Sequence, residues 1–237
     1  MSANQQPSEM LILAGGFGTR LKSLVSDVPK PMAPVAKRPF LAYLLDYWMD
    51  QGIQRFVLST GHLARVVESY FGKTYRNASI TYVREQSPLG TGGALRLALD
   101  SVPWANDTAL MANGDTWFPV SLKQLCADAQ QQNAPITLAL KRLEKNDRYG
   151  GVALSADGKI KSFGVKSEGF SHINAGCYLF NVDEMKKALA GMPEAFSLEN
   201  DFLVPFAARG LVGSSIQELP FLDIGIPEDY QKASDFF

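Results

Sequence analysis

The chain has 237 residues, which fits one large α/β domain or two small ones. Hydrophobic residues make up 46% of it and charged residues 20%, so it can bury a core and is neither disordered nor collagen-like. It has 23 lysines and arginines and 24 aspartates and glutamates, so its net charge is -1. This charge gives no overall electrostatic attraction to a nucleic acid backbone. We therefore expect no nucleic acid partner.

Cysteine usage and apolar runs bear on the compartment. Cys126 and Cys177 are too few for a disulfide framework, and that usage fits a reducing compartment. The polar segment at 1–9 lacks the basic and apolar parts of a secretion signal, and no apolar run approaches the ~20 residues of a membrane span. These features predict a soluble cytoplasmic protein with no membrane partner.

In the first half of the chain, strand patterns alternate with helix patterns. The predicted strands are 10–14, 53–59, 80–84 and 109–112, and the predicted helices are 40–52, about 63–71, 91–99 and 122–132. This alternation predicts an α/β fold with a mainly parallel, Rossmann-like sheet and helices on both faces.

After Pro135 the pattern becomes mixed. The predicted strands are 136–140, 151–154, 160–165, 174–180 and 216–219, and the predicted helices are 184–190 and 198–208. No linker rich in Ser, Gly or Pro marks a domain boundary. We expect a single domain over 1–237, whose two halves, about 10–134 and about 135–230, share one core.

A glycine-rich loop, LAGGFGTRL at 13–21, follows the first predicted strand. Such a loop can bring bare backbone N–H groups against phosphate oxygens. It is no Walker A loop, because Thr19 and Arg20 follow Gly18, and Leu21 stands where the dinucleotide fingerprint needs its third glycine. A tight turn with a surface arginine is the alternative. The candidate nucleotide contacts here are Leu13, Ala14, Gly15, Gly16, Gly18, Thr19 and Arg20.

Lys30 stands between two prolines in the PKPM element at 29–32. The proline rings restrict the backbone on both sides of it. A lysine held near Arg20 would place two positive charges on one polyphosphate. Taken alone, a proline-flanked lysine is more often an exposed turn.

Two more motifs follow, SPLGTGGAL at 87–95 and ANGDTWF at 112–118. With the glycine loop and PKPM, their order and spacing make the chain resemble the sugar-1-phosphate nucleotidylyltransferases, or NDP-sugar pyrophosphorylases, over about 10–230. The pattern is most like that of the D-glycero-D-manno-heptose and mannose 1-phosphate guanylyltransferases. The resemblance implies the nucleotide-diphospho-sugar transferase fold, with a nucleotide-binding first half and a sugar-phosphate-binding second half.

The resemblance also implies a Mg²⁺ cofactor held by Asp115 and Asp223, which lie 108 residues apart in the sequence. Carboxylate and phosphate oxygens suit this hard cation. Asp115 could instead cap a helix, and Asp223 could be a turn residue. Asp115 follows a predicted strand at its carboxyl end, where α/β sheets bind ligands, and this position favours a functional role.

SPLGTGGAL is the family's base-reading segment. Its glycines would leave a flat approach to the base, with Gly90 and Thr91 in contact with it. Glu85, just upstream, could accept hydrogen bonds from guanine N1–H and the exocyclic amine. Thr91 could instead be a helix N-cap, and the two roles are compatible.

The sugar side is less complete. Relatives carry a Glu-Lys pair where this chain has Val165 and Lys166, so the lysine is available for the sugar phosphate and the acid is missing. Glu199 matches a position facing the sugar, although a charged helical residue is often simply solvated. The candidate sugar-phosphate contacts are Asn113, Gly151, Lys166, Asn174, Gly176 and Glu199.

These residues predict transfer of a nucleotidyl group from GTP to a sugar 1-phosphate, with release of pyrophosphate. Arg20 and Lys30 would neutralise the leaving pyrophosphate, Lys166 would hold the attacking phosphate, and Asp115 would hold the metal. A mannose-1-phosphate guanylyltransferase, or a uridylyl- or cytidylyltransferase of the same family, is the alternative enzyme. From another class, a non-catalytic nucleotide-sugar-binding regulatory subunit would share the fold. The oligomeric state is left open.

Overall fold

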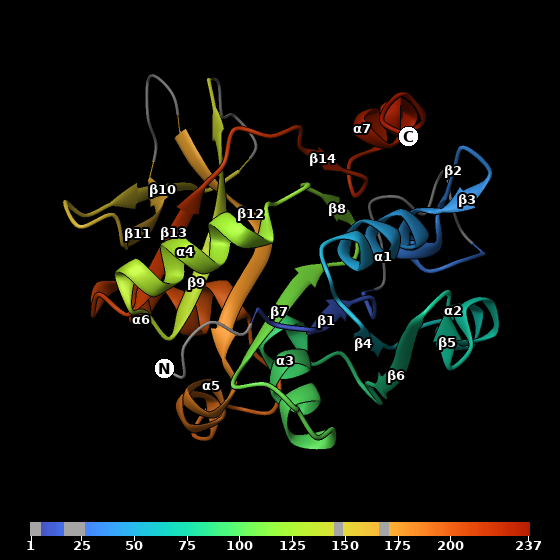
Figure 1. The fold of residues 1–237 in the computed structure, drawn as a ribbon, viewed down its shortest axis with the longest axis horizontal. Helices are drawn as coiled ribbons and strands as arrows, with labels where there is room; N and C mark the ends of the chain where they lie inside the picture. The colour runs from blue at the N-terminus through green and yellow to red at the C-terminus, as the bar shows by residue number, and fades with distance from the viewer. Residues whose placement is uncertain (1–5, 17–26, 145–148, 166–170) are drawn as a thin grey trace.

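The computed structural model describes residues 6–16, 27–144, 149–165 and 171–237. Within these ranges, ten strands form one sheet in the order β11-β10-β12-β7-β1-β4-β6-β5, with β9 beside β12 and β13 beside β9 (Figure 1). Its strands are β1 (Glu9–Leu13), β4 (Arg55–Thr60), β5 (Thr74–Tyr75), β6 (Ala78–Arg84), β7 (Thr108–Asn113), β9 (Ile136–Leu143), β10 (Gly151–Leu154), β11 (Ile160–Val165), β12 (Ser171–Asn181) and β13 (Val212–Ile216).

Four neighbouring strands, β7, β1, β4 and β6, run parallel. Leu13 pairs with Ser59 on one side and with Asn113 on the other, so the carboxyl ends of these strands meet at one edge. β12 runs antiparallel to both β7 and β9 and joins the second half of the chain to the same sheet. The predicted mainly parallel sheet is therefore confirmed.

Helices cover both faces of the sheet (Figure 1). One face packs against α1 (Phe40–Asp50), α2 (Ala64–Phe71) and α4 (Leu122–Gln132). The other packs against α3 (Gly90–Ser101), α5 (Val182–Leu189), α6 (Val204–Ala208) and the π-helix Leu198–Leu203. β1 is buried on both sides, because Met10 and Ile12 face the first layer and Leu11 the second. This explains its continuous apolar run.

Glycines lie just beyond the carboxyl ends of two helices. Gly72 follows α2 with φ +61°, and Gly52 lies two residues beyond α1 with φ +99°. This backbone region strains other residues, so a glycine stops a helix at little cost. At α4 the start is fixed instead, because Ser121 Oγ accepts a hydrogen bond from Gln124 N.

The last predicted strand is wrong in position. It lies at Val212–Ile216 rather than at 216–219, because its sequence VGSSI lacks the apolar alternation of a strand. Two buried serines there are satisfied by other elements: Ser215 Oγ donates to Asp128 and Ser214 Oγ to the Gly158 carbonyl. Helix 198–208 is also not uniform, since it consists of the π-helix followed by α6.

Short elements add two small sheets that the sequence does not predict. β2 (Pro34–Val35) pairs with β3 (Arg38–Pro39), and β8 (Thr116–Trp117) pairs with β14 (Leu222–Asp223), which precedes α7 (Pro227–Lys232). Two-residue strands carry no periodic signal. No helix of the described ranges is long and apolar enough to cross a bilayer.

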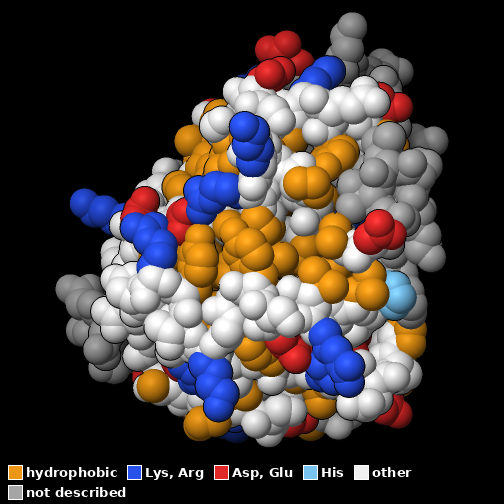
Figure 2. Space-filling model, turned by 90° about the vertical axis from the view of Figure 1, so that its right-hand side faces the viewer, with side chains coloured by type: hydrophobic (Ala, Val, Ile, Leu, Met, Phe, Trp, Pro, Cys, Tyr) orange, Lys and Arg blue, Asp and Glu red, His pale blue; other side chains and the backbone are white. Residues whose placement is uncertain are grey.

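Aromatic contacts fasten the end of the chain to α1. Phe237 stacks on Tyr43 with ring centroids 4.2 Å apart and meets Trp117 edge-on at 4.7 Å. The face of the molecule on this side shows a group of apolar side chains bordered by lysines and arginines (Figure 2). Asp223 lies between β13 and this anchored end, so both of its flanks are held.

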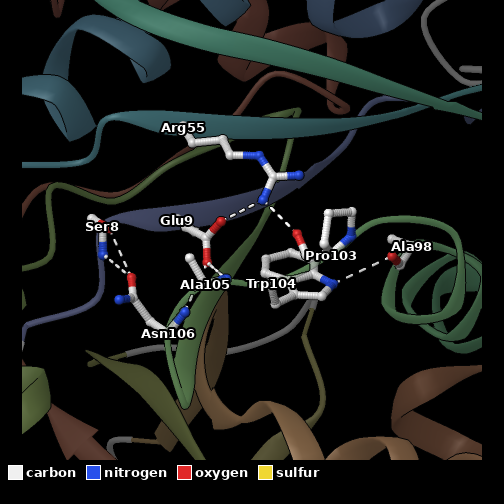
Figure 3. A network of polar contacts seen from close by, with 8 residues as sticks. All are labelled: Ser8, Glu9, Arg55, Ala98, Pro103, Trp104, Ala105 and Asn106. Atoms are coloured by element: carbon white, nitrogen blue, oxygen red, sulfur yellow. Dashed lines mark hydrogen bonds and ion pairs between the residues drawn. The ribbon is translucent and has the colours of Figure 1, made fainter.

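A buried polar network holds the amino end of β1 (Figure 3). Glu9, only 3% exposed, forms an ion pair with Arg55 and accepts hydrogen bonds from the backbone N–H groups of Ala105 and Asn106. Ser8 Oγ donates to Asn106 Oδ1 at 2.7 Å. The network joins β1, β4 and the loop before β7 at the edge opposite the carboxyl ends of the parallel strands.

Candidate active site

A pocket of about 540 Å³ opens where β1, β4, β6 and β7 end. This is the edge at which open α/β sheets bind ligands. The pocket is lined by Leu13, Gly15, Gly16, Lys30, Pro31, Gly61, His62, Glu85, Gln86, Ser87, Pro88, Gly90, Thr91, Ala94, Asn113 and Asp115. The structure thus brings residues of all four sequence motifs together at one opening.

Pairing of β8 with β14 brings the two candidate metal ligands together. Asp223 pairs with Thr116, the neighbour of Asp115, and Ile224 N donates to the Asp115 carbonyl at 3.0 Å. Asp115 precedes a strand, so the helix-cap alternative is wrong. Asp223 also acts as a turn residue, because its Oδ1 accepts a hydrogen bond from Gly225 N at 2.7 Å.

Lys30 lies beside both carboxylates. Its Nζ is 2.8 Å from Asp115 Oδ2, and its side chain is only 11% exposed. A Cβ atom on Gly225 would lie 2.7 Å from Lys30 Nζ and equally near Asp223 Oδ1. Glycine at 225 therefore leaves the space in which the lysine approaches the aspartates.

The donor set of this corner fits Mg²⁺. Asp115 and Asp223 offer carboxylate oxygens, which this cation prefers. Among the described residues, no group of three or more His, Cys, Asp or Glu side chains could enclose a metal. Two carboxylates leave most positions of an octahedral ion to water and substrate oxygens, as at nucleotide sites.

The first glycine loop is described up to Gly16, and Gly18, Thr19 and Arg20 lie outside the described residues. Gly15 is required by close packing, since a Cβ there would lie 2.6 Å from Glu85 Oε1. Gly16 has nothing within 4 Å of its Cβ position and faces the pocket. Ala14 is buried and its N–H donates to the Ser59 carbonyl at 2.8 Å, so that N–H is committed to the sheet.

Glu85 lines the pocket with its carboxylate fixed. Ser59 Oγ donates to Oε1 at 3.0 Å, and Leu89 N donates to Oε2 at 3.2 Å. Each carboxylate oxygen keeps a lone pair beyond these bonds. The side chain is thus an oriented acceptor at the pocket wall.

The glycines of SPLGTGGAL serve a different purpose from the one predicted. A Cβ on Gly92 would lie 2.1 Å from the Phe196 ring, and one on Gly93 would lie 2.5 Å from the Glu194 carbonyl oxygen. Both are buried against residues 194–196, so a flat approach to the base is wrong for them. The helix-cap alternative for Thr91 is also wrong, because α3 begins at Gly90 and Thr91 Oγ1 accepts from Leu198 N.

Four of the predicted sugar-side residues lie together. Asn174 Nδ2 donates to Glu199 Oε2 and to the Tyr178 hydroxyl, both at 2.9 Å. Gly176 has φ +71°, and a Cβ there would lie 2.5 Å from Asn113 Nδ2. Glu199 is half-buried and paired, so the simple solvated alternative is wrong. Burial raises the pKa of the Tyr178 hydroxyl, which therefore stays neutral.

Gly151, another predicted sugar-side residue, has a different role. Gly151 is required where β10 packs on β11, since a Cβ there would lie 2.2 Å from the Val165 carbonyl oxygen. Lys166 lies outside the described residues.

Sequence reasoning does not find several residues in or beside the site. Ser59 orients Glu85, and Gly61 and His62 line the pocket directly after β4. Tyr178 supports Asn174 from within β12. The position of 59–62 at the carboxyl end of the second parallel strand was a usable signal, whereas Tyr178 looks like any core aromatic residue.

Comparison with known proteins decides the family. A sequence model of a family described as nucleotidyl transferase matches residues 9–237. The chain belongs to the nucleotidyl transferase family. This transferase is 41% identical over 231 residues to the D-glycero-alpha-D-manno-heptose 1-phosphate guanylyltransferase of Aneurinibacillus thermoaerophilus, covering 95% of this chain and 96% of that protein. It is 36% identical to the Campylobacter jejuni protein of that name, covering 94% and 96%.

Solved structures agree with the sequence comparison. The transferase superposes on the crystal structure of HddC from Yersinia pseudotuberculosis with a TM-score of 0.84 and 33% identity, covering 97% of this chain and 99% of that one. A second HddC structure, complexed with GMP-PN, gives a TM-score of 0.82 and 31% identity over the same shares. The predicted nucleotide-diphospho-sugar transferase fold is therefore confirmed.

Proposed function

We propose that this nucleotidyl transferase moves the guanylyl group of GTP to D-glycero-D-manno-heptose 1-phosphate, giving a GDP-sugar and pyrophosphate. The observation that carries the proposal is the pocket itself, which is lined by the oriented Glu85 carboxylate and by Lys30 and Asp115, with Asp223 beside these last two residues. Similarity to two heptose 1-phosphate guanylyltransferases over nearly their full length supports the choice of sugar and base.

Glu85 is proposed to select guanine. Guanine offers N1–H and an exocyclic amine side by side, and a carboxylate accepts both. Adenine and the pyrimidines do not present that pair of donors, and a site built on such bonds rejects their analogues strongly. Ser59 and Leu89 hold the carboxylate in place, so little ordering is needed when the base arrives.

The transfer itself is proposed to depend on positioning and charge. A sugar phosphate oxygen attacks the α-phosphorus of GTP, the α–β bridging bond breaks, and pyrophosphate leaves. A phosphate monoester is already anionic at neutral pH, so no general base is required. Lys30 and Arg20 neutralise the leaving pyrophosphate, and Lys166 holds the attacking phosphate. Bound by Asp115 and Asp223, Mg²⁺ would neutralise phosphate charge.

The sugar is proposed to lie against the cluster of Asn113, Asn174, Gly176 and Glu199. A Cβ on Gly176 would clash with the Asn113 amide, so glycine at 176 lets Asn113 pack against β12 within the cluster. Glu199 accepts from Asn174 and keeps further acceptor capacity for sugar hydroxyls. In this proposal the nucleotide occupies the half at about 10–134 and the sugar phosphate the half at about 135–230, in a cytoplasmic protein.

A mannose-1-phosphate guanylyltransferase is the second candidate, favoured by 32% identity to the enzyme of that name from Mycobacterium tuberculosis, of which this chain covers 63%. A non-catalytic regulatory subunit is disfavoured, because such a protein has no need of Lys30, Asp115 and Asp223 together.

Pyrophosphate release tests the proposal. The protein is mixed with Mg²⁺ and each of GTP, ATP, UTP and CTP, crossed with heptose, mannose and glucose 1-phosphates. GTP with heptose 1-phosphate should give the highest kcat/KM. Asp115→Asn should lose most of this activity, and Arg76→Ala, which alters an exposed ion pair with Asp46, should retain it. Release of no pyrophosphate from any pair would support the regulatory alternative.

A further inference from the structure

Residues 192–198, here called the strap, run across the start of α3. Two backbone hydrogen bonds join them: Gly92 N donates to the Phe196 carbonyl at 3.1 Å, and Phe196 N donates to the Leu89 carbonyl at 2.9 Å. Arg96 adds a third attachment, since its guanidinium donates to the Met192 carbonyl and lies 5.8 Å from the centroid of the Phe196 ring. The strap is thus fastened to the segment that lines the nucleotide pocket.

The glycines at the start of α3 allow the strap to pack closely against it. Gly90, with φ +70°, would place a Cβ 2.5 Å from the Phe196 carbonyl oxygen, and Gly92 and Gly93 are equally confined by residues 194–196. Side chains at these positions would push the strap away from α3. The SPLGTGGAL motif is therefore explained by packing between two segments about a hundred residues apart.

Thr91 attaches the far end of the strap to α3 through its side chain. Its Oγ1 accepts from Leu198 N at 2.9 Å. Leu198 is the first residue of the π-helix, and the first amides of a helix have no acceptor within it. Asn200 N, another of these first amides, donates to Ser197 Oγ at 3.2 Å. The start of this helix is therefore set from α3 as well as from its own cap.

Glu199 follows directly. Its Oε2 accepts from Asn174 Nδ2 at 2.9 Å, and Asn174 Oδ1 in turn accepts from Gly176 N at 3.1 Å. Thr91 at the nucleotide pocket is therefore connected to the strand that carries Gly176 by hydrogen bonds at Leu198 N and at the Glu199 carboxylate, and the backbone between these two residues joins the two sets.

We propose that Thr91 is a positioning residue for the sugar-phosphate side: through Leu198 N it fixes Glu199, and so couples the nucleotide segment to the sugar segment. The inference rests on the proposed function, because Glu199 is assigned to the sugar there. Thr91 itself is exposed at the pocket rim, so its hydroxyl contributes little to the core. Loss of the hydroxyl should therefore act on placement of the helix start rather than on folding.

Thr91→Val and Thr91→Ser test this. Valine keeps the shape and removes the acceptor, and serine keeps the hydroxyl. In Thr91→Val, the KM for heptose 1-phosphate should rise about three- to tenfold, the usual effect of one hydrogen bond, and by more than the KM for GTP. Thr91→Ser should return it to near the wild-type value. Ser121→Ala, which removes the capping hydroxyl of α4 away from the pocket, should leave both KM values unchanged.

Hydrogen exchange gives a readout that needs no substrate. The Leu198 amide should exchange faster in Thr91→Val and at the wild-type rate in Thr91→Ser. An unchanged Leu198 rate, an unchanged sugar KM, or a GTP KM that rises as much as the sugar KM would each overturn the proposal, and the last would assign the hydroxyl to the nucleotide. Wild-type protein that transfers no nucleotidyl group would overturn the proposed function and the coupling with it, while the exchange rates would still report whether Thr91 anchors the strap.

Discussion

Lys30 Nζ lies 2.8 Å from Asp115 Oδ2, so a largely buried cation already neutralises one carboxylate of the metal corner. Lysine and metal therefore compete for the same oxygen. Substitution of the two partners of this ion pair should therefore change the Mg²⁺ requirement in opposite directions.

Asp115→Asn should raise the Mg²⁺ concentration needed for half-maximal activity by about tenfold or more, because it removes an anionic ligand. Asp223→Asn should act in the same direction. Lys30→Gln should lower that concentration, since the carboxylate loses its competing cation, while it lowers kcat. Mg²⁺ titrations at saturating substrates measure all three. A midpoint that stays at the wild-type value in an aspartate variant would remove that residue from the metal site.

Glu85→Gln should weaken discrimination between GTP and ITP, which differ only in the exocyclic amine. The wild-type protein should prefer GTP by about tenfold or more in kcat/KM, as expected for a hydrogen bond to a charged acceptor. The amide has one acceptor oxygen, so the preference should shrink. Glu68→Gln, on the surface in an ion pair with Arg84, is the matched control and should keep the wild-type ratio. An unaltered ratio in Glu85→Gln would show that another group selects the base.

Arg55→Ala should cost about 3–5 kcal/mol of unfolding free energy, because it leaves the buried Glu9 carboxylate without its cation. Arg76→Ala breaks an exposed ion pair and should cost less than about 1 kcal/mol. Urea denaturation of the two variants provides the comparison. Equal losses would mean that the network in Figure 3 does not stabilise the amino edge of the sheet.

Gly92→Ala should destabilise the fold by about 1–3 kcal/mol, because its methyl group would lie 2.1 Å from a ring carbon of Phe196. Gly191→Ala is a suitable control, since no atom lies within 4 Å of its Cβ position. Thermal unfolding of both proteins measures the difference. A Gly92→Ala protein as stable as Gly191→Ala would show that the strap can move to accommodate the methyl group without loss of stability.

Both thiols should resist alkylation in the folded protein. Burial raises the pKa of Cys126 to about 11 and that of Cys177 to about 12, so at pH 8 neither forms much thiolate. These pKa values exceed the unfolded value of about 8.5. The contribution of the two neutral thiols to the free energy of unfolding is therefore fully present below about pH 8.5, and it is lost as the pH rises through 11 to 12. Mass spectrometry after iodoacetamide at pH 8 should find labelling only once urea is present. Rapid labelling of Cys177 in buffer would contradict its burial.

Periodicity predicts the parts of this fold whose side chains face an apolar layer. β1 and α1 follow from runs that are buried on both sides or on one face. β13 could not be predicted, because its buried serines depend on partners in other elements. The short pairing of β8 with β14 is likewise a tertiary event, yet it is what places Asp223 beside Asp115.

In the candidate site too, local motifs predict some residues, and the roles of others depend on tertiary contacts. Motifs identified Glu85, Lys30 and Asp115 as pocket residues because each follows a strand end or a fixed turn. The role of Gly92 could not be seen from sequence, since its neighbour Phe196 is about a hundred positions away. A glycine beside a nucleotide motif predicts open space, and here it reflects close packing instead.

Direct competition tests the central claim. One reaction contains equal concentrations of GTP, ATP, UTP and CTP together with heptose and mannose 1-phosphates and Mg²⁺, and mass spectrometry identifies the nucleotide sugars formed at low conversion. Product ratios then equal ratios of kcat/KM. GDP-heptose should be the main product. A UDP-, CDP- or ADP-sugar as the main product would contradict the guanine assignment, and GDP-mannose as the main product would contradict the heptose assignment.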